Sequence, residues 1–179
     1  MREKRSKSMN RREELRKMAR CPCPLCRGEI EEQVINVVME LERQTGEEAR
    51  ITSGNRCEEY NKKIGGYSDS PHIPKPKGKA VDMQIKGINN IKLAYAAERA
   101  GFKRIGIYPN HVHGDIVDPR PSKYWYLKSY QSTAVYSKGI KTLKEFLNKL
   151  KKEGGLNQND DLDNTFINNN RSNIISLFQ

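Results

Sequence analysis

The sequence has few apolar residues and no long apolar run. Only 35% of its 179 residues are hydrophobic, and the mean hydropathy is −0.87. No segment approaches the roughly 20 apolar residues that a membrane-spanning helix needs. The basic N-terminus is not followed by an apolar stretch, which argues against a secretory signal peptide. We therefore expect a protein made in the cytoplasm, with one modest core and polar extensions.

Motifs of nucleic-acid-binding proteins are also missing. The net charge of +11 favours a polyanionic partner, such as nucleic acid, an anionic membrane or an anionic cell-wall polymer. Neither an aromatic-rich RNA-binding motif nor a basic recognition helix occurs in the sequence. Charge alone therefore does not indicate a specific nucleic-acid partner.

Histidine is scarce, and its placement is uneven. All three histidines fall in two short stretches: SPHIPKPKGKAVD contains His72 and ends at Asp82, and HVHGD contains His111 and His113 and ends at Asp115. The HExxH motif of helical zinc proteases is absent. Imidazole and carboxylate are nevertheless the ligands of catalytic zinc sites. From spacing alone, a metal site and ordinary surface or hydrogen-bonding roles remain equally open.

Four cysteines form a second group with two interpretations. Cys21, Cys23 and Cys26 follow a C-x-C-x2-C pattern, and Cys57 comes much later. Four thiolates are able to hold a structural zinc ion that fastens the N-terminal segment to the core. The alternative is reduced thiols, or one or two disulfides in an oxidising compartment. Prolines between the first cysteines predict a loop rather than a helix.

Apolar periodicity predicts alternating helices and strands, which indicates an α+β fold. A basic N-terminal arm (1–20), helical or disordered, precedes the expected domain (21–153), and a polar, disordered tail (154–179) follows it. The expected helices are 31–44, 58–64, 89–100 with Asn89 as its N-cap, and 142–152. The expected strands are 50–53, 80–85, 105–108 and, as the last core strand, 111–116, with a Pro- and Tyr-rich loop over 118–130.

Strand alternation predicts which side chains share a face of the sheet. In the strand over 80–85, Asp82 and Gln84 lie opposite the apolar residues. In the strand over 111–116, His111, His113 and Asp115 lie on one face. The polar, metal-capable groups thus gather on rigid elements.

Several of these residues form an ordered pattern. Ser53-Gly54-x-Arg56-Cys57, Asn61, Gly65-Gly66, Ser70-x-His72 and Gly78-x-Ala80-x-Asp82 follow one another along the chain. The pattern resembles that of the zinc D-alanyl-D-alanine carboxypeptidase group of peptidoglycan peptidases, whose phage endolysins and murein endopeptidases share a fold with the hedgehog signalling domain. Gly106-Ile107-Tyr108-Pro109 before His111-Val112-His113-x-Asp115, with Arg120 and Trp125 after it, is most similar to the murein endopeptidase branch. The resemblance covers about residues 20 to 127.

The resemblance implies a small antiparallel sheet with flanking helices and one catalytic zinc ion. It implies His72, Asp82 and His113 as the metal ligands. It implies that Arg56 is the cation that binds a substrate carboxylate or carbonyl, a role that suits the planar guanidinium group. Ser70 becomes a neighbouring substrate-side or turn residue.

The sequence departs from the family pattern in two places. Nine residues separate His72 from Asp82, where the family usually has six. Many relatives also place a carboxylate shortly before the last ligand, and none stands there in this chain. His111 is therefore our candidate for the catalytic base or transition-state stabiliser. Asp115 is expected to orient His113 or His111.

Together these features predict a monomeric zinc peptidase that cleaves amide bonds in peptidoglycan stem peptides or cross-links. The alternative is a non-catalytic zinc-containing module of the same fold, for example a virion component. We expect action on the cell wall after release from the cytoplasm, or transport in a virion. The sequence leaves endopeptidase and carboxypeptidase activity equally open.

Overall fold

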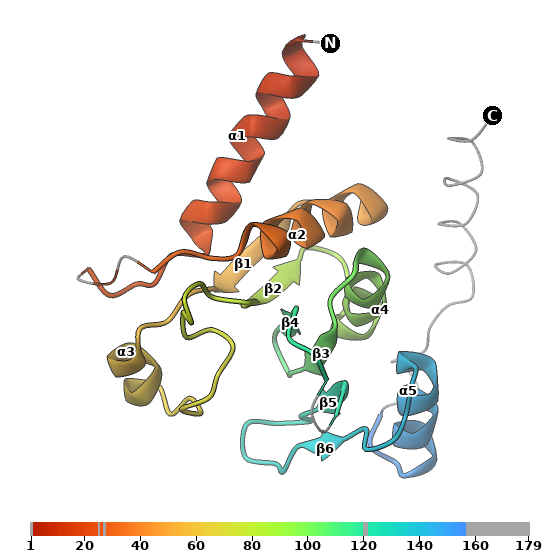
Figure 1. Cartoon of the computed structure of the whole chain (residues 1–179). Coiled ribbons are helices and arrows are strands. Elements are labelled where there is room, and N and C mark those ends of the chain that lie inside the picture. Colours follow the sequence, from red (N-terminus) through yellow and green to blue (C-terminus); the bar gives the residue numbers. More distant parts are fainter. Residues whose placement is uncertain (1, 25, 27, 120–121, 157–179) are drawn as a thin grey trace, which may run out of the picture.

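The computed structural model describes residues 2–24, 26, 28–119 and 122–156. It shows the predicted α+β fold, in which helices pack around one sheet (Figure 1). Arg120 and most of the predicted tail (157–179) lie outside the described residues. The division of the chain into arm, domain and tail therefore stays a prediction.

The sheet has six strands in the order β1-β2-β4-β3-β5-β6. Each pair of neighbours is antiparallel except β3 and β5, which are parallel. The expected antiparallel sheet is thus confirmed, with one parallel addition. The strands are β1 (Ala49–Ser53), β2 (Ala80–Ile85), β3 (Arg104–Ile107), β4 (Val112–Asp115), β5 (Tyr124–Tyr126) and β6 (Val135–Tyr136).

Two strands correct the predictions for the region after Asp115. The segment 118–130 is not all loop, because β5 lies within it, and 111–116 is not the last strand. β5 pairs with β3, with Ile105 opposite Tyr124. A three-residue strand shows too little alternation to be recognised, since its stability comes from the neighbouring strand rather than from its own pattern.

Two helices pack against the apolar face of the sheet. α2 (Glu32–Thr45) ends at Gly46, whose φ of 73° is a left-handed conformation that suits glycine. α4 (Asn90–Ala100) begins after Asn89, whose side chain accepts a hydrogen bond from the Lys92 N–H at 2.9 Å. Their buried side chains form one core with those of the sheet; among them are Val34, Val38, Leu41, Leu93, Ala97, Val81 and Met83.

Two further helices flank the sheet. α3 (Glu58–Lys63) follows the predicted range within one residue and precedes the long loop to β2. α5 (Leu143–Lys152) is capped by Thr142, and its apolar stripe is buried as predicted. Phe146 of α5 stacks on Tyr124 of β5, with 6.0 Å between ring centroids. The C-terminal helix thereby supports the added strand.

The N-terminal segment is helical and partly built into the core. α1 (Arg2–Met18) projects from the body, and its C-terminal end reaches α2 and β1 (Figure 1). Leu15 and Ala19 are fully buried. The Arg11 guanidinium contacts a Glu42 carboxylate oxygen at 2.6 Å. Within the described part of the chain, no helix combines the length and the hydrophobicity needed to cross a membrane.

Candidate metal centre

The three predicted ligands meet at one point on the polar face of the sheet. Asp82 on β2 and His113 on β4 are direct partners in the antiparallel register. His72 reaches them from the loop between α3 and β2. The Nε2 of His72, Oδ1 of Asp82 and Nδ1 of His113 are 2.8 to 3.2 Å apart, and all three side chains are buried.

These donor atoms fit a zinc ion. A tetrahedral site with bonds of 2.0–2.1 Å places its ligand atoms about 3.3 Å apart. The observed spacing needs only a small adjustment to reach that value. Two imidazole nitrogens and one carboxylate oxygen are also a donor set typical of catalytic zinc sites, in which a fourth position stays open.

Both histidines are oriented by hydrogen bonds on the ring nitrogen that points away from the site. His72 Nδ1 donates to the Gly54 carbonyl at 2.6 Å, which leaves Nε2 directed at the other ligands. His113 Nε2 donates to Asp115 Oδ2 at 3.1 Å, which leaves Nδ1 directed at Asp82 and His72. Arg104 Nε holds both oxygens of Asp115 at 2.9 Å. Such contacts fix the tautomer that a metal requires.

The pKa shifts show that Asp82 is ionised and that the surroundings of His113 favour positive charge, whereas burial lowers the pKa of His72. Burial alone raises the pKa of Asp82, but His72 and His113 lower it well below its usual value. Burial alone lowers the pKa of His113, but the carboxylates of Asp115 and Asp82 raise it to about 9. A cation placed between these groups meets an ionised carboxylate on Asp82 and a second negative charge behind His113.

We expect Asp115→Asn to weaken zinc binding at this site by about 10- to 100-fold, because the variant loses the charge that orients His113. Competition with a chromophoric chelator measures the zinc Kd. Asp118→Asn is the matched control, since Asp118 is exposed and contacts Lys103 at 2.7 Å, away from the ligands. An unchanged Kd for Asp115→Asn would contradict a role in orienting the ligand.

Arg56 and Ser70 lie beside the three ligands. Arg56 Nε donates to Ser53 Oγ at 2.8 Å, and its Nη2 pairs with the second carboxylate oxygen of Asp82. Asp82 thus directs one carboxylate oxygen toward the two histidines and the other toward the Arg56 guanidinium. Ser70 Oγ accepts the N–H of His72 at 3.4 Å, so it also supports the turn that delivers this ligand.

The three candidate metal ligands line a cleft of about 600 Å³. Its walls are rich in aromatic rings, and Arg56, Ser70 and His111 also border it. Sequence reasoning missed Asp69, which is exposed there, and Ser122, whose buried Oγ has no hydrogen-bond partner within the described residues. The aromatic lining residues are Tyr67, Tyr108, Trp125, Tyr130 and Tyr136.

His111 faces the metal-binding residues from the cleft side. Its Nε2 is 3.9 Å from Asp82 Oδ1, and its ring stacks on Tyr108 with 4.4 Å between centroids. Its Nδ1 is 2.8 Å from Asn110 Oδ1 and donates to it, which leaves Nε2 able to accept a proton. Burial lowers the pKa of His111, although the charge on Asp82 opposes this. Asp115, by contrast, is fully buried behind His113.

The longer spacing between His72 and Asp82 is accommodated outside the cleft. The Gly78 N–H donates to the Glu29 carbonyl, and the Glu31 N–H donates to the Gly78 carbonyl, each at 2.8 Å. The segment 73–79 therefore folds onto residues 29–31, and none of it lines the described cleft. His72 reaches the other ligands despite the extra residues.

Trp125 closes one side of the site because β3 carries a glycine opposite it. A Cβ on Gly106 would lie 2.3 Å from the indole, so only glycine allows the ring to cover the strand. The indole lies against His113, with 5.2 Å between ring centroids, and donates to the Tyr108 hydroxyl at 3.0 Å. The cleft wall and the ligand are thus packed together.

Comparison with known families gives one match. The family model described as Peptidase M15 matches residues 5–115, more than half of the chain. The matched range contains His72, Asp82 and His113. No curated protein shows significant similarity to the sequence. Given this match and a site suited to zinc, the chain belongs to the peptidase M15 family of zinc peptidases.

Proposed function

We propose that this zinc peptidase hydrolyses amide bonds in the stem peptides or cross-links of peptidoglycan. The observation that carries the proposal is a three-ligand metal site that borders an aromatic-walled cleft beside Arg56. The resemblance to peptidoglycan peptidases supports this substrate class. The net charge of +11 suits an anionic cell wall, which the protein would reach after release from the cytoplasm or within a virion.

The zinc ligands in this proposal are His72, Asp82 and His113. Bound zinc supplies Lewis acidity, which polarises the scissile carbonyl and strengthens water as a nucleophile. His111 accepts a proton at Nε2 and returns it to the leaving amine, a role that its position on the cleft side of Asp82 allows. Asp115 acts only through His113, as a positioning residue.

Arg56 orients the substrate in this proposal. Its guanidinium is 14% exposed and borders the cleft, while Ser53 and Asp82 hold it from behind. A planar guanidinium group held in this way presents N–H donors to a carboxylate or carbonyl oxygen of the substrate. Tyrosine and tryptophan side chains around it offer apolar surface with polar edges, which suits a peptide carrying sugar and acid groups.

The test is digestion of purified peptidoglycan by the zinc-loaded protein, with products identified by mass spectrometry. We expect new fragments cut within the stem peptide or cross-link, and none after chelation of zinc. His111→Gln should retain zinc but form fragments about 100-fold more slowly or worse, as expected for loss of a general base.

Two results would contradict these assignments. Zinc binding without any fragments would favour the non-catalytic module over the peptidase. Equal rates for the wild type and His111→Gln would exclude His111 as the proton acceptor while leaving the substrate class intact.

A further inference from the structure

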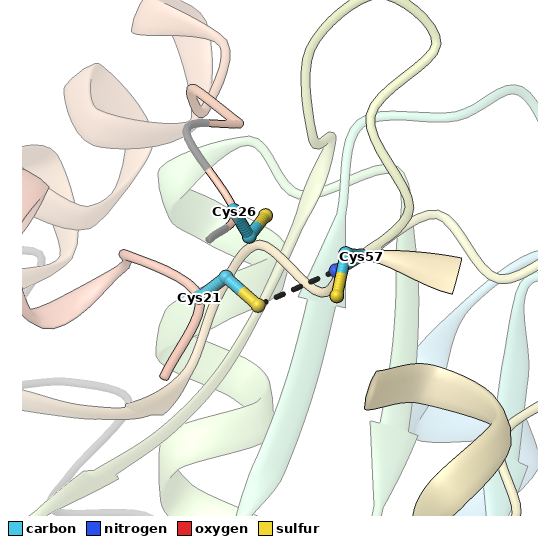
Figure 2. Close-up of side chains that lie close together, drawn as sticks. All are labelled: Cys21, Cys26 and Cys57. Atoms are coloured by element: carbon cyan, nitrogen blue, oxygen red, sulfur yellow. Dashed lines mark hydrogen bonds between the residues drawn. The ribbon is translucent and has the colours of Figure 1, made fainter. Parts of the chain in front are cut away.

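A second group of metal-capable side chains lies away from the cleft. Cys21 and Cys26 come from the loop after α1, and Cys57 is the N-cap residue of α3. Their Sγ atoms all lie within 4.8 Å of one another. Figure 2 shows the three side chains close together, where the cysteine loop meets the segment that leads into α3.

Cys23 stands in the same loop, between Cys21 and Cys26, but its Sγ is not one of the three that lie within 4.8 Å of one another. The Cys23 side chain interacts with the Cys57 thiol. The N–H of Cys26 donates to the Cys23 carbonyl at 3.1 Å, so the C-x2-C segment forms a tight turn. This spacing is one that zinc sites use repeatedly. Three of the four thiols, from two separate segments, therefore converge, and the fourth stands between two of them in the chain.

Backbone amides surround these sulfur atoms. The N–H of Cys57 donates to Cys21 Sγ at 3.4 Å, and the N–H of Tyr60 donates to Cys57 Sγ at 3.4 Å. Donors aimed at sulfur stabilise the thiolate form, which is the form that binds metal.

We propose that Cys21, Cys23, Cys26 and Cys57 hold a structural zinc ion. Four thiolates with bonds of 2.3 Å place their sulfur atoms about 3.8 Å apart. The three sulfur atoms within 4.8 Å of one another reach that spacing with a small contraction, and Cys23 is the proposed fourth ligand. Disulfides would join the sulfurs in separate pairs, whereas three of the sulfurs lie within 4.8 Å of one another and all four cysteines are free thiols. The close approach of three sulfur atoms and the backbone N–H donors to two of them favour a bound metal ion over disulfides.

The proposed ion joins the N-terminal segment to the segment that supports the cleft. Asn55 N–H donates to the Ala19 carbonyl at 2.8 Å, immediately before the cysteine loop. Gly54 accepts the hydrogen bond that orients His72, and Arg56 directly precedes Cys57. The cysteine zinc would therefore hold in place the chain segment that carries Arg56 and positions one ligand of the other metal site.

The first test uses the wild type and needs no variant to fold. Protein purified with a non-thiol reductant is analysed by native mass spectrometry and by alkylation with iodoacetamide. We expect two zinc ions per chain, and four thiols that react only after zinc is removed. Replacement of zinc by cobalt should produce a thiolate-to-metal charge-transfer absorption.

Variants separate this site from the peptidase site. His113→Ala should retain one zinc ion and its protected thiols, and Cys26→Ser should lose that ion. A zinc content that disappears entirely in His113→Ala would overturn the proposal. So would freely reactive thiols in the zinc-loaded wild type, or a disulfide between any two of these cysteines. None of these readouts depends on activity toward peptidoglycan.

Discussion

Replacing Asp82 with asparagine should remove zinc from the histidine site and lower kcat/KM by at least about 1,000-fold, or about 4 kcal/mol of transition-state stabilisation. The carboxylate is the only negatively charged ligand among the three. Its second oxygen also pairs with Arg56, so the substitution leaves a guanidinium that is only 14% exposed without its counter-charge. Metal binding and substrate orientation are therefore lost together.

The measurement combines zinc content with the rate of fragment release from peptidoglycan. Asp69→Asn is the matched control, because Asp69 is an exposed carboxylate that borders the same cleft. The control should retain its zinc, and its rate should stay within a few-fold of the wild type. If Asp82→Asn bound zinc as tightly as the control, Asp82 could not be a ligand.

Gly54→Ala should be the most destabilising small substitution in the segment before Arg56. A Cβ at this position would lie 2.4 Å from the Ala19 carbonyl oxygen and 2.5 Å from the Ala19 Cα. Both are backbone atoms, so a rotamer change cannot relieve the clash. We expect the free energy of unfolding to fall by about 3 kcal/mol, the upper end for overpacking.

The same substitution should weaken zinc binding, because displacement of the Gly54 carbonyl removes the hydrogen bond that orients His72. Urea unfolding of metal-free protein gives the stability, and chelator competition gives the zinc Kd. Gly65→Ala is the control: Gly65 has φ of 74°, but nothing lies within 4 Å of an added Cβ. It should cost about 1 kcal/mol from backbone strain alone and leave the Kd unchanged. Equal losses in the two variants would contradict a steric origin.

Elements with a strong local pattern could be predicted from the sequence. The apolar stripe of α2, the Asn89 cap of α4 and the alternation in β2 each depend on residues close together in the chain. The alternation in β2 correctly predicted that Asp82 lies on the polar face of the sheet. The alternation in β4 predicted the same face for His113, which pairs with Asp82 in the register. Predictions of this kind succeed because side-chain direction follows directly from backbone period.

Features that depend on distant contacts could not be predicted. β5 forms because it pairs with β3, where Tyr124 lies opposite Ile105. The sequence of its three residues does not indicate a parallel partner strand. Leu15 and Ala19 are buried although the surrounding segment is highly charged. Ser122 and Asp69 border the cleft only because the fold brings together segments that are distant in the sequence. The pairing of Arg56 with Asp82 likewise joins two segments that the sequence separates by 26 residues.

The part of the chain that follows β4 has a consequence for how the cleft of this enzyme can change in evolution. All three candidate metal ligands fall within the range that matches the family. Four residues of the cleft lie beyond it: Ser122, Trp125, Tyr130 and Tyr136. The reactive centre and this part of the cleft wall are therefore encoded in separate stretches of the gene. Mutation or recombination downstream of codon 115 can alter selectivity while the hydrolytic machinery is inherited intact.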